Sequence, residues 1–208
     1  AACFDLSAAC TGFLYAMSVA DAYIKAGMYK KVLVIGAEVM SQVVDWKDRS
    51  VCVLFGDGAG AVVLGEDISG KSIFRLHSDS GSAQALTLGK ENAVHMNGRE
   101  IFSFAVRKVP ESVKEVLEES ETAKEQVKYF ILHQANARMI ESIAKRLDVP
   151  VEKFPMNLET HGNTSAASIP VLLDELNRQN RLIPGDVLIL SGFGGGLSWG
   201  SALLEWHK

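Results

Sequence analysis

Short apolar runs that alternate with helix-like patterns constrain the fold of this chain more than any other feature. The segment Lys31 to Gly36 reads Lys-Val-Leu-Val-Ile-Gly, which is typical of a strand buried on both faces. Between such runs, apolar residues recur every three or four positions, as Phe13, Leu14 and Met17 do, and this spacing indicates helices. The alternation predicts a fold of the α/β class.

The order of the predicted elements indicates an internal duplication. Strands are expected at residues 2–6, 31–36, 51–55, 59–64, 72–77, 129–132, 186–191 and 197–206. Helices are expected at residues 10–26, 98–119, 135–147 and 165–180, with Pro110 as a kink in the second. Residues 1–66 and 129–206 share a loose strand, helix and glycine-turn order. Because the chain opens inside a predicted strand, Ala2 to Leu6, we expect an amino-terminal portion to precede it.

Charge and composition exclude several classes of protein. The formal net charge of −4 and the pI of about 5.8 argue against general nucleic-acid binding, which requires a broad basic surface. No apolar run approaches the roughly 20 residues that cross a bilayer, so no membrane contact is expected. Cys3, Cys10 and Cys52 show neither metal-ligand spacing nor an even-numbered disulfide framework, which predicts a reducing, cytoplasmic location and no metal.

Cys10 is the first candidate catalytic residue. It follows a predicted strand and opens a predicted helix, where the positive end of the helix dipole favours the thiolate. Its small neighbours, Ser7-Ala8-Ala9 before it and Gly12 after it, permit a sharp turn and close approach of a substrate. The alternative is that Cys10 is only a buried apolar residue, which is our interpretation of Cys3 and Cys52 within their apolar strands.

His133 and Asn163 are the second and third candidates. His133 ends an apolar strand, and Asn163 lies in His161-Gly162-Asn163-Thr164-Ser165, just before a predicted helix. Each has a structural alternative: His133 as a buried histidine, and Asn163 or Thr164 as a helix cap. A thiol, an imidazole and an amide can together carry out acyl transfer, as nucleophile, proton donor and fixed dipole.

Two glycine-rich segments admit a functional and a structural interpretation. Residues 55–61, Phe-Gly-Asp-Gly-Ala-Gly-Ala, lack the spacing of a dinucleotide-binding loop and favour a turn between strands. Residues 193–197, Phe-Gly-Gly-Gly-Leu, are either a tight turn or a source of backbone N–H groups that stabilise an oxyanion. Arg138, Lys145 and Arg146 share one helix face, which is either simply solvated or a docking patch for an acidic partner.

Taken together and in order, five segments resemble one family. They are Ser7-Ala8-Ala9-Cys10-Thr11-Gly12-Phe13, the glycine-rich run 55–61, His133-Gln134-Ala135-Asn136, the run His161 to Ser168, and Gly194-Gly195-Gly196-Leu197-Ser198-Trp199-Gly200. In this order they are similar to β-ketoacyl-acyl-carrier-protein synthase III, the initiating condensing enzyme of type II fatty acid synthesis. The resemblance covers essentially the whole chain.

The resemblance implies a thiolase-like α/β fold, in which two similar halves form an αβαβα layered sandwich. Residues 1–70 then correspond to the end of the amino-terminal half, and residues 71–208 to the carboxy-terminal half. The first half is expected to be incomplete in this chain. The family resemblance further implies a homodimer, acyl-CoA and malonyl-acyl carrier protein as substrates, and no cofactor, since acyl-CoA is itself consumed.

The resemblance also assigns roles to individual residues. Cys10 takes an acyl group from acyl-CoA, His133 and Asn163 stabilise the enolate that forms when malonyl thioester loses carbon dioxide, and the N–H groups of Cys10 and Gly195 form an oxyanion hole. Arg49 matches a position near the CoA nucleotide, and Phe102 matches one near the substrate tunnel. Asn136 matches a position that supports the site formed by Cys10, His133 and Asn163. Arg138, Lys145 and Arg146 fit carrier-protein docking, whereas Ser103 replaces a basic residue found in several relatives.

Other functions remain open on the sequence. Polyketide-type ketosynthases share the Cys-His-Asn set, although the segments after Asn163 and Phe193 fit the initiating synthase better. Papain-like cysteine proteases also run Cys, His, Asn along the chain, but Thr11-Gly12 after Cys10 does not match their signature. A third alternative is a catalytically incompetent fragment, because residues of the first half that bind CoA would lie outside this chain.

Overall fold

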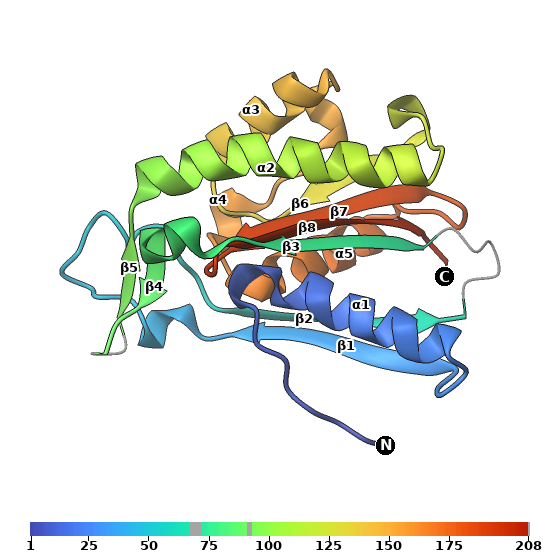
Figure 1. Cartoon of the computed structure of the whole chain (residues 1–208), viewed down its shortest axis with the longest axis horizontal. Coiled ribbons are helices and arrows are strands. Elements are labelled where there is room, and N and C mark those ends of the chain that lie inside the picture. The colour runs from blue at the N-terminus through green and yellow to red at the C-terminus, as the bar shows by residue number, and fades with distance from the viewer. Residues whose placement is uncertain (67–71, 91–92, 208) are drawn as a thin grey trace.

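The computed structural model describes residues 1–66, 72–90 and 93–207, and it arranges them in alternating layers (Figure 1). Helices α2 (Gly98–Glu119) and α3 (Ala137–Leu147) cover one face of a four-stranded sheet. Helices α1 (Gly12–Lys25) and α5 (Ser168–Arg178) lie between that sheet and a two-stranded sheet. The predicted α/β class is confirmed, and the described residues form four layers in the order helices, sheet, helices, sheet.

The strand order places the ends of β6 and β7 next to each other. The larger sheet has the order β3 (Ile73–Ser78), β8 (Ser198–Glu205), β7 (Val187–Gly194) and β6 (Tyr129–Leu132). Strands β6 and β7 are parallel, and the other two pairings are antiparallel. Because parallel strands end at the same edge of a sheet, the residues that follow β6 lie beside the carboxy-terminal half of β7.

The remaining elements are the smaller sheet, a short hairpin and several single turns of helix. Strands β1 (Lys31–Glu38) and β2 (Gly58–Gly65) form the smaller antiparallel sheet, with Lys31 opposite Gly65. A hairpin of β4 (Leu86–Leu88) and β5 (Val94–Met96), which the sequence did not predict, stands at one end of the molecule. The others are α4 (Leu158–His161) and the 3-10 turns η1 (Ala9–Thr11), η2 (Met40–Gln42), η3 (Ser80–Ala85), η4 (Lys124–Gln126), η5 (Val151–Lys153) and η6 (Ser165–Ala167).

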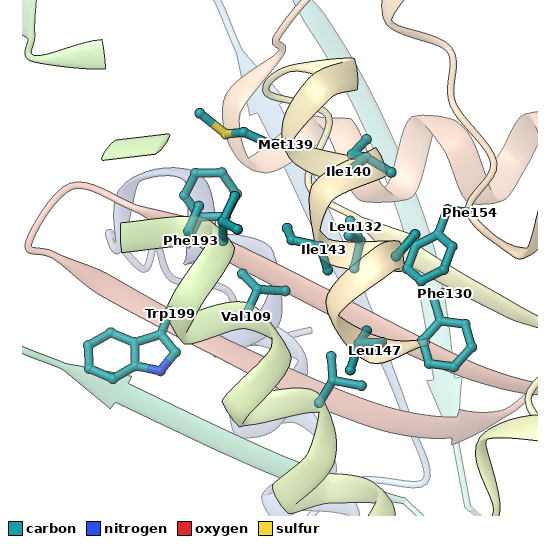
Figure 2. Packing of buried hydrophobic residues seen from close by; sticks show 14 of the residues in the cluster. Val109, Phe130, Leu132, Met139, Ile140, Ile143, Leu147, Phe154, Phe193 and Trp199 are labelled. Carbon is teal, nitrogen blue, oxygen red and sulfur yellow. The ribbon is translucent and has the colours of Figure 1, made fainter. Parts of the chain in front are cut away.

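Two apolar cores hold the layers together. In the outer core, Val109 of α2 and Ile143 of α3 lie over Leu132 of the sheet, and the stacked rings of Phe130 and Phe154 close one side (Figure 2). The inner core joins α1, α5, the other face of the larger sheet and the inward side of β1 and β2. The near-continuous apolar character of β6 and β7 therefore follows from burial on both faces.

Helix α5 approaches the smaller sheet closely because β2 carries a glycine at the contact. A Cβ atom on Gly60 would stand 2.7 Å from the backbone nitrogen of Val171. The opposite, outward face of this sheet is apolar and exposed, with Leu33 at 60%, Ile35 at 58% and Val63 at 63% of their full accessible surface. The alternation of exposed and covered residues along β1 and β2 shows that only one face of this sheet is packed in the described structure. The predicted strand at residues 31–36 is therefore confirmed, but its expected burial on both faces is wrong.

Two predicted strands are wrong. Residues 2–6 form no strand and are largely exposed. Residues 51–54 form successive turns instead, with the N–H groups of Val51 and Cys52 both bonded to the carbonyl oxygen of Asp48. Consequently Cys3 is exposed and Cys52 is half-buried, contrary to the expected burial of both.

Other expectations need smaller corrections or remain predictions. Helix α2 has the predicted bounds, and it continues through the buried Pro110 as one helix. Both helices expected at 10–26 and 165–180 begin later than expected, each behind a 3-10 turn. The predicted boundary between residues 70 and 71 lies outside the described residues. No helix in the described part of the chain is long and apolar enough to cross a bilayer.

Candidate active site

Cys10 sits in a tight turn that ends where α1 begins. The preceding Ala9 adopts a φ of +47°, and Thr11 is the residue before the first helical position. The turn is pressed against β7: a Cβ atom on Gly194 would stand 2.8 Å from the Cys10 nitrogen and 2.9 Å from its Cβ. Glycine is therefore required at 194, because any side chain would displace the Cys10 backbone.

Burial controls the protonation of Cys10. The residue is only 8% exposed, and burial raises the pKa of its thiol to about 11. The Glu38 carboxylate also raises this pKa, whereas contact with the Ser165 side chain and the Cys10 backbone N–H lowers it. The expected thiolate at the start of the helix is therefore opposed by burial, which is the largest influence on this pKa and favours the protonated thiol.

His133 is buried directly after β6. It is 2% exposed, its backbone N–H donates to the Ser191 carbonyl oxygen at 2.8 Å, and its ring meets that of Phe193 edge-on at 5.4 Å. Both Ser191 and Phe193 belong to β7, so the parallel pairing of β6 and β7 places the imidazole beside the strand that also carries Gly194. Burial lowers the pKa of His133 to about 4, and the ring is neutral at physiological pH.

A hydrogen-bond chain selects the tautomer of His133. The Gln134 backbone N–H donates to Ser168 Oγ at 3.3 Å, and Ser168 Oγ lies 2.7 Å from His133 Nδ1. Within the described residues, His133 Nδ1 is the one acceptor that the Ser168 hydroxyl meets, because its other partner, the Gln134 N–H, is a donor; the hydroxyl hydrogen therefore points to Nδ1 of the neutral ring. The proton of His133 is thereby assigned to Nε2, which becomes a hydrogen-bond donor.

Asn163 is oriented by its own backbone neighbourhood. It is 7% exposed, and its Oδ1 accepts the N–H of Ser165 at 2.8 Å. Its backbone N–H donates to the Leu54 carbonyl oxygen at 2.8 Å, while its carbonyl oxygen accepts from Gly56 at 3.0 Å. With Oδ1 occupied by Ser165, the amide NH₂ group is the end that can donate to a ligand.

One short segment, residues 163–168, joins the three predicted residues. Asn163 begins it, Ser165 contacts both the Cys10 side chain and the Asn163 amide, and Ser168 bonds His133. The turn η6 in this segment also packs against η1, which carries Cys10. A buried thiol and two side chains that can donate N–H groups thus lie around the segment 163–168, which forms a serine-rich turn. These three groups are suited to thioester chemistry.

The glycine turn after β7 borders the Cys10 turn. A Cβ atom on Gly195 would stand 3.5 Å from the Ala9 Cβ, so the backbone of Gly195 runs beside the residue that precedes the nucleophile. Turn residues 195–197 connect β7 to β8. The predicted pair of backbone donors, Cys10 and Gly195, therefore lies on two turns in mutual contact.

Three further predicted residues lie on other elements. Arg49 is exposed in the turn-rich segment before β2, and Phe102 is half-buried on α2 at the edge of the outer core. Asn136 caps α3, its Oδ1 accepting the Arg138 N–H at 2.9 Å, so its observed bond is to the helix and not to the three central residues. Their assignments to substrate remain predictions.

The basic residues of α3 are exposed as expected. Arg138 lies in the first turn, and Lys145 and Arg146 lie in the last. Among the described residues, no carboxylate forms a salt bridge with any of the three. Arg146 also borders a shallow surface pocket of about 340 Å³ together with Ser103 and Arg107 of α2.

Sequence reasoning missed the residues that support the site. Ser165 and Ser168 were seen only as part of a motif, and Glu38 was not singled out, although it is the lone acidic residue of the apolar run 31–39. Partial burial raises the pKa of Glu38, whose carboxyl group also contacts Ala166 and Ser165.

Within the described parts of the chain, no three His, Cys, Asp or Glu side chains are grouped to hold a metal ion.

Comparison with known proteins gives a consistent result. Residues 4–96 match the family model described as 3-oxoacyl-[acyl-carrier-protein (ACP)] synthase III, and residues 117–206 match the model of its C-terminal part. Beta-ketoacyl-[acyl-carrier-protein] synthase III of Clostridium acetobutylicum is 46% identical over 223 residues, covering 100% of this chain and 69% of the relative. A Bacillus cereus protein of this kind is 47% identical and is covered over 67% of its length.

Solved structures agree with the sequence comparison. The crystal structure of 3-oxoacyl-[acyl-carrier-protein] synthase III from Aquifex aeolicus superimposes with a TM-score of 0.94 at 46% identity, covering 98% of this chain and 67% of that one. A priming beta-ketosynthase from a polyketide biosynthetic pathway gives a TM-score of 0.93 at 35% identity, covering 99% of this chain and 66% of that one.

Proposed function

Since this chain belongs to the 3-oxoacyl-[acyl-carrier-protein] synthase III family, we propose that it catalyses the initiating condensation of type II fatty acid synthesis. In this acyltransferase reaction, an acyl-CoA starter and malonyl-acyl carrier protein give β-ketoacyl-acyl carrier protein, CoA and carbon dioxide. The single observation that carries the proposal is the segment 163–168, which connects the buried Cys10, His133 and Asn163.

In the first half-reaction, Cys10 Sγ attacks the thioester carbon of acyl-CoA. A new C–S bond to Cys10 forms, the C–S bond to CoA breaks, and the thiol proton leaves with the CoA sulfur. Because burial raises the Cys10 pKa to about 11, the thiol is protonated before the substrate arrives. The developing negative charge on the carbonyl oxygen is stabilised by the backbone N–H groups of Cys10 and Gly195.

In the second half-reaction, His133 Nε2–H and the Asn163 NH₂ donate to the thioester oxygen of malonyl-acyl carrier protein. Carbon dioxide leaves, and the electron pair of the broken C–C bond moves into the enolate that these donors stabilise. The enolate carbon attacks the acyl carbon on Cys10, so that a new C–C bond forms and the C–S bond to Cys10 breaks. Cys10 leaves as a thiolate, which takes up a proton from water and restores the thiol. A neutral His133 suits this role, since it remains a donor without adding a buried charge.

The outer residues are proposed to handle the carriers of the two acyl groups. Arg49 lies near the CoA nucleotide, Phe102 lines the substrate tunnel, and Asn136 supports the loop that follows His133. The exposed Arg138, Lys145 and Arg146 dock the acidic acyl carrier protein, which is supported by their lack of salt bridges within the described structure. We further propose a cytoplasmic homodimer that needs no cofactor and contacts neither membrane nor nucleic acid.

A second function is favoured by one specific comparison. The priming beta-ketosynthase of a polyketide pathway is 35% identical to this chain, so a polyketide-type starter condensation uses a very similar fold. The two functions share the acyl-Cys10 intermediate and differ in the starter and in the fate of the product. Turnover with a panel of acyl-CoA starters and the two classes of carrier protein distinguishes them.

The test of the proposed function is the intact mass of the full-length protein after mixing with acetyl-CoA. We expect one added acetyl group on the wild type and none on Cys10→Ser, whereas Cys52→Ser, a matched change at a half-buried cysteine, keeps the adduct. Adding malonyl-acyl carrier protein should then remove the acetyl group and release carbon dioxide. A folded wild type that takes no acyl group from any starter in a panel would overturn the proposal and favour an incompetent protein.

A further inference from the structure

Two buried hydroxyl groups lie between the turn that carries Cys10 and the turn that carries Gly195. Thr11, the residue after the nucleophile, is completely buried, and Ser198, the first residue of β8, is 6% exposed. They are 187 positions apart in the chain, yet Thr11 Oγ1 and Ser198 Oγ are in direct contact. Neither hydroxyl has a role in the two half-reactions described above.

Each hydroxyl also contacts a backbone carbonyl group of its own turn. Thr11 Oγ1 lies 2.7 Å from the Ala8 oxygen, and Ser198 Oγ lies 3.0 Å from the Gly195 oxygen. Three contacts therefore compete for the two hydroxyl hydrogens, because neither carbonyl group has a hydrogen to donate. If both hydrogens pointed to the carbonyl groups, the two hydroxyl oxygens would touch without a hydrogen between them, which is repulsive.

The favourable arrangements are the two that keep the hydroxyl–hydroxyl bond. In one, Ser198 donates to Thr11, which donates to the Ala8 oxygen; in the other, Thr11 donates to Ser198, which donates to the Gly195 oxygen. Either arrangement links the two turns by a continuous chain of hydrogen bonds. Since both side chains are shielded from water, this bond is not weakened by exchange with solvent.

The two turns need such a link because their backbones are in close contact and one is strained. Ala9 has a φ of +47°, a conformation that a residue with a Cβ atom adopts only when its surroundings enforce it. The Cys10 backbone rests against Gly194, and Ala9 rests against Gly195. A small displacement of either turn would change the separation of the Cys10 and Gly195 N–H groups, on which oxyanion stabilisation depends.

We propose that Thr11 and Ser198 are positioning residues that fix the spacing of the two backbone donors of the oxyanion hole. The inference rests on the proposed acylation of Cys10 and adds two residues that act through the backbone without touching the substrate. Loss of either hydroxyl lowers the rate at which Cys10 is acylated. It leaves the affinity for acyl-CoA nearly unchanged, since both side chains are buried and their hydroxyl groups bond protein atoms.

The test uses the full-length protein and single-turnover acylation by acetyl-CoA, followed by intact mass. We expect Thr11→Val, which keeps the side-chain shape, and Ser198→Ala each to slow acylation about 10- to 100-fold, with the KM for acetyl-CoA within about twofold of the wild type. Thr11→Ser retains the hydroxyl, so Cys10 in this variant should be acylated at a rate much nearer that of the wild type than that of Thr11→Val. The double variant should be about as slow as the slower single variant, because one shared bond is lost.

The matched control is Ser201→Ala in the same β7–β8 hairpin. Ser201 is fully buried and its hydroxyl donates to Ser191 Oγ at 2.8 Å, so the variant also loses one buried hydroxyl–hydroxyl bond, but away from the Cys10 turn. We expect a similar loss of thermal stability and an acylation rate within about twofold of the wild type.

Three outcomes would overturn the inference. The first is wild-type acylation in both folded variants, Thr11→Val and Ser198→Ala. The second is a Ser201→Ala variant slowed as much as they are, which would make the effect one of general stability. The third is a Thr11→Ser variant as slow as Thr11→Val. If Thr11→Val does not fold, Ser198→Ala and its rescue by Ser198→Thr decide the question. Absence of acylation in the wild type would instead overturn the proposed function first, and this inference with it.

Discussion

At the scale of single residues, the site depends on burial as much as on residue type. Cys10, His133 and Asn163 have exposures of 8%, 2% and 7%, so each exchanges hydration for contacts within the protein. For the two ionisable groups, the consequence is that both are held neutral, with the pKa raised in Cys10 and lowered in His133. Neutral groups suit a site that must admit an uncharged thioester and develop charge only during reaction.

Burial of His133 predicts a specific loss of stability in acid. Its folded-state pKa of about 4 lies below the unfolded value of 6.5, so the unfolded state binds a proton first as the pH falls. The contribution of neutral His133 to the free energy of unfolding is complete above pH 6.5 and is lost as the pH falls toward 4. At pH 5 the free energy of unfolding is therefore about 2 kcal/mol lower than at pH 8. Urea unfolding at the two pH values, for wild type and His133→Gln, measures it.

The comparison with His133→Gln isolates this residue because all other titrating groups are shared. We expect the variant to lose less free energy of unfolding than the wild type between pH 8 and pH 5. Equal losses in the two proteins would show that His133 is solvated or already paired as an imidazolium ion, and would contradict the assigned neutral tautomer.

Ser168 is predicted to separate the two half-reactions. Ser168→Ala removes the hydroxyl that directs the His133 proton to Nε2, so decarboxylation and condensation should slow by about 10-fold or more. Acylation of Cys10, which does not use His133 in the proposed mechanism, should stay close to the wild-type rate. Acylation is measured by intact mass and condensation by release of carbon dioxide.

Ser168→Thr provides the control, since it keeps the hydroxyl group at the same position. Its condensation rate is expected to lie nearer the wild type than that of Ser168→Ala. If Ser168→Ala slowed both half-reactions equally, Ser168 would have a general packing role and the tautomer assignment would lose its support.

At the scale of elements, the site is an assembly of segment ends. Cys10 lies in the turn before α1, His133 follows β6, Asn163 precedes η6, and Gly195 follows β7. None of these four positions lies within a regular helix or strand, yet each is fixed by an element that is buried in a core. Rigid elements with functional side chains at their ends are the usual way in which α/β folds build a site.

Because α5 lies close to the smaller sheet at Gly60, a single added methyl group at this position is expected to lower the stability of the protein. Gly60→Ala places a Cβ atom 2.7 Å from the Val171 nitrogen, and relief of this clash should cost about 1–3 kcal/mol of the free energy of unfolding. Gly65→Ala in the same strand is the matched control, because a Cβ atom there meets nothing within 4 Å. Urea unfolding midpoints of the two variants and the wild type provide the comparison.

Because α5 follows the serine-rich turn directly, a shift of this helix should reach the site. We therefore expect Gly60→Ala to slow acylation of Cys10 as well, and Gly65→Ala to leave it unchanged. Equal stability of the two variants would contradict the observed packing of β2 on α5.

At the scale of the whole molecule, segments that are distant in sequence meet at the site. The turn that carries Cys10 packs against α1 and β7, whereas His133 follows β6 and is bonded to Ser168 at the start of α5. The charged surface is also distributed unevenly, since Arg138, Lys145 and Arg146 stand together on α3 in a chain of net charge −4. This asymmetry is what an acidic partner would recognise over the rest of the surface.

Reversal of the α3 charges is expected to affect only the step that uses acyl carrier protein. In a variant with Arg138, Lys145 and Arg146 all changed to Glu, the KM for malonyl-acyl carrier protein should rise about 10-fold or more at low salt. Acylation by acetyl-CoA should not change. Steady-state kinetics at two ionic strengths measure both effects, and the difference between wild type and variant should shrink as salt screens the charges.

The control for charge reversal is Lys30→Glu with Lys31→Glu, two exposed lysines at the start of β1. This pair changes net charge in the same direction but lies at the start of β1 and not on α3. A comparable rise in KM for the control would mean that overall charge, and not a docking surface on α3, governs the encounter.

The sequence by itself determined the class of fold, most elements and the central residues. The apolar run 129–132 corresponds to β6 because a strand buried on both faces must be apolar along its whole length. The run 31–36 also forms a strand, β1, although one face of β1 is exposed in the described structure. The motifs around Cys10, His133 and Asn163 were recognisable because each of them is a continuous stretch of the chain. Local pattern and resemblance therefore sufficed wherever the determining residues are neighbours in sequence.

Only the tertiary structure decided which segments pair, what is buried and how the site is linked. Residues 2–6 and 51–54 look like strands locally, but a strand forms only when a neighbouring segment supplies a ladder of hydrogen bonds. In the described structure neither segment is part of a strand, and beside residues 51–54 only the single bridge of Phe55 to Asn163 forms. The raised pKa of Cys10, the assignment of the His133 proton through Ser168 and the Thr11–Ser198 contact all depend on residues distant in sequence. Burial and side-chain contact are properties of the packed molecule, and no local pattern of residues encodes them.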